Sequence, residues 1–186
     1  MNAFAKIDRE TFLRFAAGHP EQRYELERGR IVQQMTGGTR RHGIVGRRIA
    51  RIIEDQIDQA KWSVAIDRGV GVGTSERYPD VVVEPASEPL DSLETECPAI
   101  IVEVLSPSTT ATDLNTKPSE YLNITALDAY IVASQDEAAL LVWVRDNNGE
   151  FPKTGIEVEG VDQTIVINGR GLDVTLKLRD IYDGIV

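Results

Sequence analysis

Apolar runs in the middle of the chain predict strands that are buried on both faces. The run from Ile100 to Leu105 is apolar apart from Glu103, and a second run, Val81–Val83, begins directly after Asp80. Runs of this kind are typical of strands in a sheet that is covered on both sides. Further strands are predicted over 62–72, 129–133 and 140–144, and near residues 156, 165 and 174.

The clearest helix is predicted over residues 40–60, where Val45, Ile49 and Ile53 recur at helical spacing on one side. Five arginines occupy the opposite side: Arg40, Arg41, Arg47, Arg48 and Arg51. Shorter helices are expected over 8–17 and 118–124, a hairpin over 23–33 with its turn at Arg28-Gly29, and a loop from 73 through 77. The pattern indicates an α/β or α+β fold with a central sheet, in one domain spanning residues 1–186.

Composition narrows the classes of protein that fit. The chain has 186 residues, of which 41% are apolar and 27% charged, and no apolar run approaches the roughly 20 residues of a membrane helix. The N-terminus lacks a secretory apolar core, and the single Cys97 cannot form an internal disulfide, so we expect a cytoplasmic protein. The net charge of −10 argues against binding to nucleic acid through bulk positive charge, although a local basic surface remains possible.

Two carboxylates are the candidates for chemistry. Glu103 interrupts an apolar strand, and a buried carboxylate is costly unless a cation compensates it. Asp80 stands at the mouth of the neighbouring strand, and Mg²⁺ in proteins is commonly held by one or two carboxylates with water and phosphate. The alternatives are an arginine partner for Glu103 and a plain turn role for Asp80. If these acids are unpaired, removing Glu103 is expected to relieve repulsion and leave the fold intact.

Other residues carry weaker signals. Lys117 could orient a metal-bound water or steady phosphate charge, but a solvated surface lysine is the commoner case. The Gly69-Val-Gly-Val-Gly73 segment lacks the spacing of a dinucleotide-binding loop, and glycines in a strand more often mark a close backbone approach.

A set of motifs falls in one order along nearly the whole chain. It comprises Tyr24-Glu-Leu-x-x-Gly29, His42 at a helix start, Pro79-Asp80, Val102-Glu-Val-Leu-Ser-Pro-Ser-Thr109, Asp113, Lys117 and Tyr121. This set resembles the Uma2 (Uma-two) family of restriction-endonuclease-like proteins, a branch of the PD-(D/E)XK nuclease superfamily. In the broader superfamily the lysine stands two residues after the glutamate, where this chain has Leu105. The Uma2-type pattern supplies the lysine from the following segment, which matches Lys117.

The resemblance implies a restriction-endonuclease-like mixed sheet flanked by helices, and cleavage of DNA phosphodiester bonds. Asp80, Glu103 and the carbonyl of Val104 are then expected to hold Mg²⁺ or Mn²⁺, with Lys117 as the third catalytic residue. Glu25 matches an acidic position near the metal, and an exposed hairpin glutamate is its alternative. A homodimer is expected.

The arginine side of the 40–60 helix is the expected DNA contact, through Arg40, Arg47, Arg48 and Arg51, although a solvated face is an alternative. Two other functions stay open. One is an interaction protein that keeps the nuclease fold without activity, and the other is a metal-dependent hydrolase of a small phosphorylated molecule.

Overall fold

The computed structural model describes residues 6–34, 38–106 and 112–186, apart from the side chains of residues 112 and 113. Its helices are α1 (Arg9–Ala17), α2 (Arg40–Glu54), α3 (Lys117–Tyr121) and α4 (Leu178–Tyr182), and a π-helical turn, η1 (Thr112–Thr116), leads into α3. Its strands are β1 (Arg23–Glu27), β2 (Arg30–Gln34), β3 (Trp62–Ile66), β4 (Gly69–Val72), β5 (Ser75–Arg77), β6 (Val81–Pro85), β7 (Glu94–Thr95), β8 (Ile100–Val104), β9 (Ala129–Ala133), β10 (Ala139–Val144), β11 (Ile156–Glu159), β12 (Thr164–Gly169) and β13 (Leu172–Lys177).

A mixed six-stranded sheet in the order β11-β10-β9-β8-β6-β3 forms the centre of the fold. Strands β8 and β9 run parallel, and the other neighbours are antiparallel. All residues of β8 and β9 are buried, as their apolar runs predict. The side chains of these strands therefore alternate between two separate layers of core.

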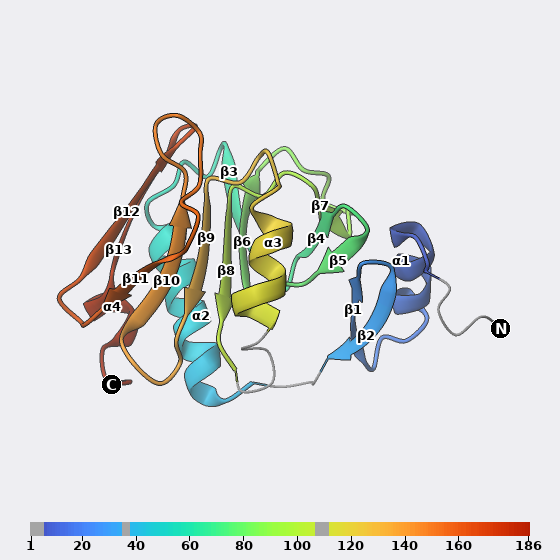
Figure 1. Cartoon of the computed structure of the whole chain (residues 1–186), viewed down its shortest axis with the longest axis horizontal. Coiled ribbons are helices and arrows are strands. Elements are labelled where there is room, and N and C mark those ends of the chain that lie inside the picture. Colours follow the sequence, from blue (N-terminus) through green and yellow to red (C-terminus); the bar gives the residue numbers. More distant parts are fainter. Residues whose placement is uncertain (1–5, 35–37, 107–111) are drawn as a thin grey trace.

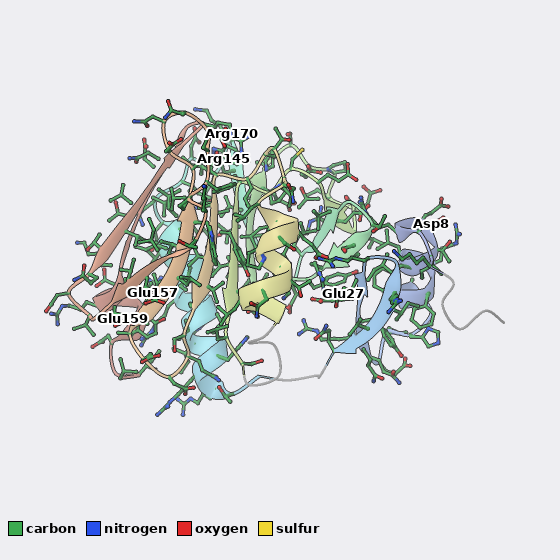
Figure 2. The ribbon with its side chains drawn as sticks, viewed as in Figure 1. Asp8, Glu27, Arg145, Glu157, Glu159 and Arg170 are labelled. Carbon is green, nitrogen blue, oxygen red and sulfur yellow. The ribbon has the colours of Figure 1, made fainter. Side chains whose placement is uncertain are left out.

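Different elements cover the two faces of this sheet (Figure 1). On one face, Val45 and Ile49 of α2 share a core with Val102 of β8 and with the β12–β13 hairpin and α4. On the other face, Tyr121 of α3 shares a core with Ile101. At the outer edge, β11 carries the exposed Glu157 and Glu159, which Figure 2 shows beside each other, and such charges discourage edge-to-edge pairing with another chain.

A second sheet, in the order β2-β1-β5-β4-β7, lies beside α1 at the N-terminal end of the molecule (Figure 1). The β1–β2 hairpin turns at Arg28 and Gly29, both with positive φ (49° and 83°), the requirement of a two-residue type I′ turn. Helix α1 begins after Asp8, whose side chain accepts a hydrogen bond from Thr11 N at 2.8 Å. The predicted hairpin, the first helix and the mixed α+β class are confirmed.

The structure differs from several of the predicted boundaries and elements. The helix expected over 40–60 ends at Glu54, with Asp55 as its C-cap. The strand expected over 62–72 divides at Asp67, where φ is +55°, and its halves join different sheets. The loop expected through Arg77 contains β5, and α4 had no expected counterpart.

The glycines of β4 are explained by close approach, as predicted. A Cβ placed on Gly71 would lie 2.0 Å from the guanidinium of Arg9, and one on Gly69 would lie 2.6 Å from Glu76 Oε1. Arg9 crosses the second sheet here, and its guanidinium lies 3.3 Å from Glu76 and 2.6 Å from Glu94. The glycines therefore make room for a charged group that joins α1 to the sheet.

Glu76 is fully buried in this cluster. Burial and the neighbouring Glu94 raise the pKa of Glu76 to about 9, despite the opposing charge of Arg9. An unfolded glutamate loses its proton near pH 4.5, whereas Glu76 keeps it until about pH 9. Between these values the folded state binds more protons, so the free energy of unfolding falls as pH rises.

Replacing Glu76 with glutamine is expected to remove this pH dependence. Glu76→Gln should raise the thermal midpoint relative to the wild type more at pH 8.5 than at pH 5, by a few degrees if about 1–2 kcal/mol is recovered. Thermal unfolding followed by circular dichroism at both pH values measures it. Glu96→Gln, which changes the exposed partner of Arg9, should show no such pH dependence. Equal destabilisation by Glu76→Gln at both pH values contradicts the assignment.

Candidate active site

A cleft of about 710 Å³ opens between the β1–β2 hairpin, the N-terminus of α2 and the ends of β6 and β8. Glu25, Asp80, Glu103, Val104 and Lys117 all line it. These residues come from four elements far apart in the sequence. The structure therefore brings every predicted catalytic and metal-site residue to one cleft.

Asp80 is fixed at the mouth of the cleft by the main chain of the neighbouring strand. Register pairs Val81 with Val102, so Asp80 stands one residue beyond the ladder, level with Glu103. Its Oδ2 accepts a hydrogen bond from Val104 N at 2.7 Å and lies 3.4 Å from His42 Nε2. His42 sits in the first turn of α2, which Thr39 caps by accepting from His42 N.

Glu103 is compensated by a cation, as its position in an apolar strand required. Lys117 Nζ donates to Glu103 Oε1 at 2.7 Å, and the Tyr121 hydroxyl donates to the same oxygen at 3.1 Å. Glu103 and Lys117 are each only 4% exposed. Burial raises the pKa of Tyr121 well above its usual value, and the charge of Glu103 adds to this, so Tyr121 stays a hydrogen-bond donor near neutral pH.

Lys117 is the first residue of α3, and Pro118 follows it within the first helical turn. Proline is well tolerated there because the first N–H groups of a helix have no partner inside the helix. The η1 turn before α3 brings Lys117 over the sheet. Residues 107–109 of the Glu-Val-Leu-Ser-Pro-Ser-Thr motif, and the side chain of Asp113, lie outside the described part of the chain.

Glu25 lies 3.9 Å from Lys117 Nζ but has closer partners. Its Oε2 accepts from Arg77 Nη1 at 2.9 Å and from Gln34 Nε2 at 3.1 Å, and its Oε1 accepts from Tyr78 N at 3.4 Å. Glu25 is buried and is not the exposed hairpin residue of the alternative interpretation.

Arg77 is a functional candidate that the sequence did not reveal. It is fully buried and donates through Nε to Glu120 Oε2 at 2.8 Å as well as to Glu25. Burial alone would lower the pKa of Arg77, but the bonds to Glu120 and Glu25 outweigh this and raise it, so the guanidinium is charged. Arg77 lies in β5, which was not predicted because the segment Ser75-Glu-Arg77 is polar. Its acidic partners, which make it a candidate, are known only from the fold.

The donor set of the cleft can be tested against a divalent ion. Among the described residues, no three His, Cys, Asp or Glu side chains gather closely enough to hold a metal by themselves. Asp80 and Glu103 offer hard carboxylate oxygens at one level of neighbouring strands, and Mg²⁺ usually keeps several waters and uses only one or two carboxylates. The residues fit such a lightly ligated ion.

The predicted DNA-binding arginines fall into two groups in the structure, three that are exposed and one that binds the C-terminal segment. Arg40, Arg47 and Arg51 are exposed and lie within about 40° of one another around α2, on the side away from Val45 and Ile49. Arg48 instead donates to the carbonyls of Ile181 at 2.8 Å and Asp183 at 2.7 Å, and so fastens the C-terminal segment to α2.

Comparisons with known proteins identify the family of this chain. Residues 9–175 match the model of the Uma2 family, which is described as "Putative restriction endonuclease". The chain belongs to the Uma2 family. An uncharacterized protein of Synechocystis, slr1290, is 26% identical over 154 residues, which cover 80% of this chain and 79% of the relative.

The Uma2 fold also has a solved counterpart. A crystal structure described as a "putative nuclease belonging to DUF820" from Anabaena variabilis superposes with a TM-score of 0.70, at 15% identity, over 89% of this chain and 93% of that one. This likeness confirms the restriction-endonuclease-like fold class. Among the described helices of this Uma2 member, none is long and apolar enough to cross a membrane.

Removing Glu103 is expected to destabilise this Uma2 protein. The premise of relieved repulsion, that the acids are unpaired, is not met, because Glu103 is paired with Lys117, and losing Glu103 removes an acidic partner that lies 2.7 Å from a buried ammonium. Glu103→Ala should cost about 3 kcal/mol of unfolding free energy, measured by urea denaturation. Asp80→Asn, at a more exposed position, should cost less.

A double variant checks the cause of that loss. Glu103→Ala combined with Lys117→Met removes both charges and should recover most of the lost stability. If the double variant is no more stable than Glu103→Ala, the ion pair is not the reason for the effect.

Proposed function

We propose that this protein is a Mg²⁺- or Mn²⁺-dependent endonuclease that hydrolyses DNA phosphodiester bonds. The observation that carries the proposal is the meeting of Asp80, Glu103 and Lys117 in one cleft, at the positions that the family pattern assigns to its site. Membership of a family described as "Putative restriction endonuclease" supports the reaction class. The metal and the DNA substrate are our inference.

Asp80, Glu103 and the main-chain carbonyl of Val104 are the proposed ligands of the divalent ion. When bound, such an ion polarises a phosphoryl oxygen and lowers the pKa of a water molecule. Asp80 is already oriented by the N–H of Val104, and Glu103 by Lys117 and Tyr121. These contacts hold both carboxylates before any ligand arrives, which lowers the cost of organising the site.

Lys117 is the proposed cation for the substrate. Its ammonium lies 2.7 Å from Glu103, so a phosphate bound beside Glu103 comes close to this positive charge. There it can neutralise charge that develops on the phosphoryl group or orient the attacking water. Burial strengthens both effects, because little water screens the charge.

The exposed stripe of Arg40, Arg47 and Arg51 is the proposed contact with the DNA backbone, together with a homodimeric assembly. The stripe lies on the opposite side of α2 from the buried core, whereas the cleft opens at the N-terminus of this helix. A symmetric dimer presents the stripe twice and places two cleavage centres on one duplex.

A second candidate is hydrolysis of a small phosphorylated molecule. The cleft has the volume of a small-ligand pocket, and four carboxylates against few cations line its described part: Glu25, Asp67, Asp80 and Glu103, with Arg23 and Lys117. Arg23 is moreover paired with Asp67. Such a cleft has little general attraction for a polyanion, which favours a small substrate over a duplex.

Cleavage of plasmid DNA tests the main proposal. The wild type with Mg²⁺ or Mn²⁺ should nick or linearise the plasmid, and Asp80→Asn and Glu103→Gln should each reduce the rate by about 100-fold or more, because a metal ligand is lost. Arg68→Met, which removes a buried ion pair with Glu84 outside the cleft, is the matched control. A wild type that cleaves no DNA but hydrolyses a small phosphodiester supports the second candidate, and no hydrolysis of either indicates an inactive member.

Salt dependence tests the arginine stripe. Arg40, Arg47 and Arg51 replaced together by glutamine should weaken DNA binding and reduce the slope of log affinity against log salt by up to about 3, at roughly 0.9 per lost phosphate contact. Ca²⁺ replaces Mg²⁺ so that binding is measured without cleavage. An unchanged slope rules this face out, and Arg41→Gln, whose side chain contacts Asp136, is the single-site control.

A further inference from the structure

A chain of alternating charges runs beneath the cleft. Arg77 binds Glu25 at 2.9 Å, Glu25 lies 3.9 Å from Lys117, and Lys117 binds Glu103 at 2.7 Å. None of these four side chains is more than 6% exposed to solvent. Water therefore does little to screen these charges, and each depends on its neighbours in the chain.

Two buried carboxylates compete for one ammonium in this arrangement. Glu25 and Glu103 stand on either side of Lys117, and the distances show that Lys117 is bound to Glu103. Arg77 donates a hydrogen bond to Glu25 from the other side, so the negative charge of Glu25 is compensated without Lys117. Glu103 accepts hydrogen bonds from Lys117 and from the Tyr121 hydroxyl.

We infer that Arg77 is a positioning residue: by holding Glu25, it keeps Lys117 on Glu103 and directed at the reacting phosphate. The inference rests on the proposed function of Lys117, although Arg77 itself does not line the cleft. Without Arg77, the buried charge of Glu25 is left with the neutral donors Gln34 and Tyr78 N. A shift of about 1 Å then brings Lys117 to Glu25, and a lysine side chain has the freedom to make it.

Arg77 has a second acidic partner, which must be separated from the first. Glu120 accepts from Arg77 at 2.8 Å, but it also accepts from Ser75 Oγ at 3.0 Å and lies 3.6 Å from Arg28 Nε. Glu120 thus keeps a cation and a hydroxyl donor when Arg77 is lost. The effect on Lys117 is expected to arise through Glu25 and not through Glu120.

The test is a double-mutant cycle with Arg77→Met and Glu25→Gln in the full-length protein. Crystal structures should show Lys117 Nζ moved from Glu103 to Glu25 in Arg77→Met, and still on Glu103 when Glu25→Gln is added. In plasmid cleavage with Mg²⁺, Arg77→Met should lower kcat by about tenfold or more with little change in KM, as the loss of an orienting partner does. In the Glu25→Gln background, the same Arg77→Met change should alter kcat less than about twofold.

Controls separate this role from plain stability. Arg68→Met removes another largely buried arginine paired with a glutamate and should leave kcat unchanged. If Arg77→Met alone does not fold, the comparison of Glu25→Gln with the double variant remains decisive: a change in kcat of more than about twofold overturns the inference, because Arg77 then acts by a route other than Glu25. The inference is overturned if Lys117 stays on Glu103 in Arg77→Met, or if Glu120→Gln rather than Glu25→Gln abolishes the effect of Arg77→Met. A wild type without cleavage overturns the proposed function, whereas the position of Lys117 in the crystal structures still tests Arg77.

Discussion

The ion pair between Lys117 and Glu103 is the interaction on which the arrangement of the site depends. Glu103 lies in a strand whose residues are all buried, and neither a carboxylate nor an ammonium is tolerated there alone. The pair therefore requires α3 to pack directly over β8, at the level where Glu103 emerges. Tyr121, one helical turn after Lys117, adds a hydroxyl to the same carboxylate and an aromatic ring to the core. Charge compensation and packing thus fix the same short helix.

The same network joins the two sheets. Arg77 comes from β5 and Glu25 from β1, both in the five-stranded sheet, while Glu103 belongs to the six-stranded sheet. Between them, Lys117 of α3 contacts Glu103 of the six-stranded sheet, and Glu120 of α3 contacts Arg77 of the five-stranded sheet. The ionic contacts beneath the cleft therefore also join the two sheets, so substituting one of these residues alters stability and site geometry together. For this reason double variants that remove both members of a pair are more informative than single truncations.

The sequence predicts those parts of the site whose signal is local. A lone glutamate in an apolar run identified Glu103 and its need for a cation, and the matching run identified Asp80. Lys117 could not be chosen from spacing, because a single lysine before a proline carries no pattern, and the family resemblance supplied it. Arg77 was missed because its partners stand 52 and 43 residues away, and no periodicity relates them. The break at Asp67 coincides with a positive φ, which is likewise set by the fold and not by a local pattern.

Electrostatics limits how such a site can take a polyanion. The protein carries a net charge of −10, and the described cations of the cleft already have acidic partners: Lys117 with Glu103, and Arg23 with Asp67. A phosphate approaching Asp80 and Glu103 meets like charge, so its binding depends on added positive charge at that point. In the proposed function, a divalent cation held by these two carboxylates would reverse the sign of the local field that a phosphate experiences. Under that proposal, the affinity for the ion and the affinity for the phosphate would be coupled, and each would increase with the other, because the two ligands carry opposite charges.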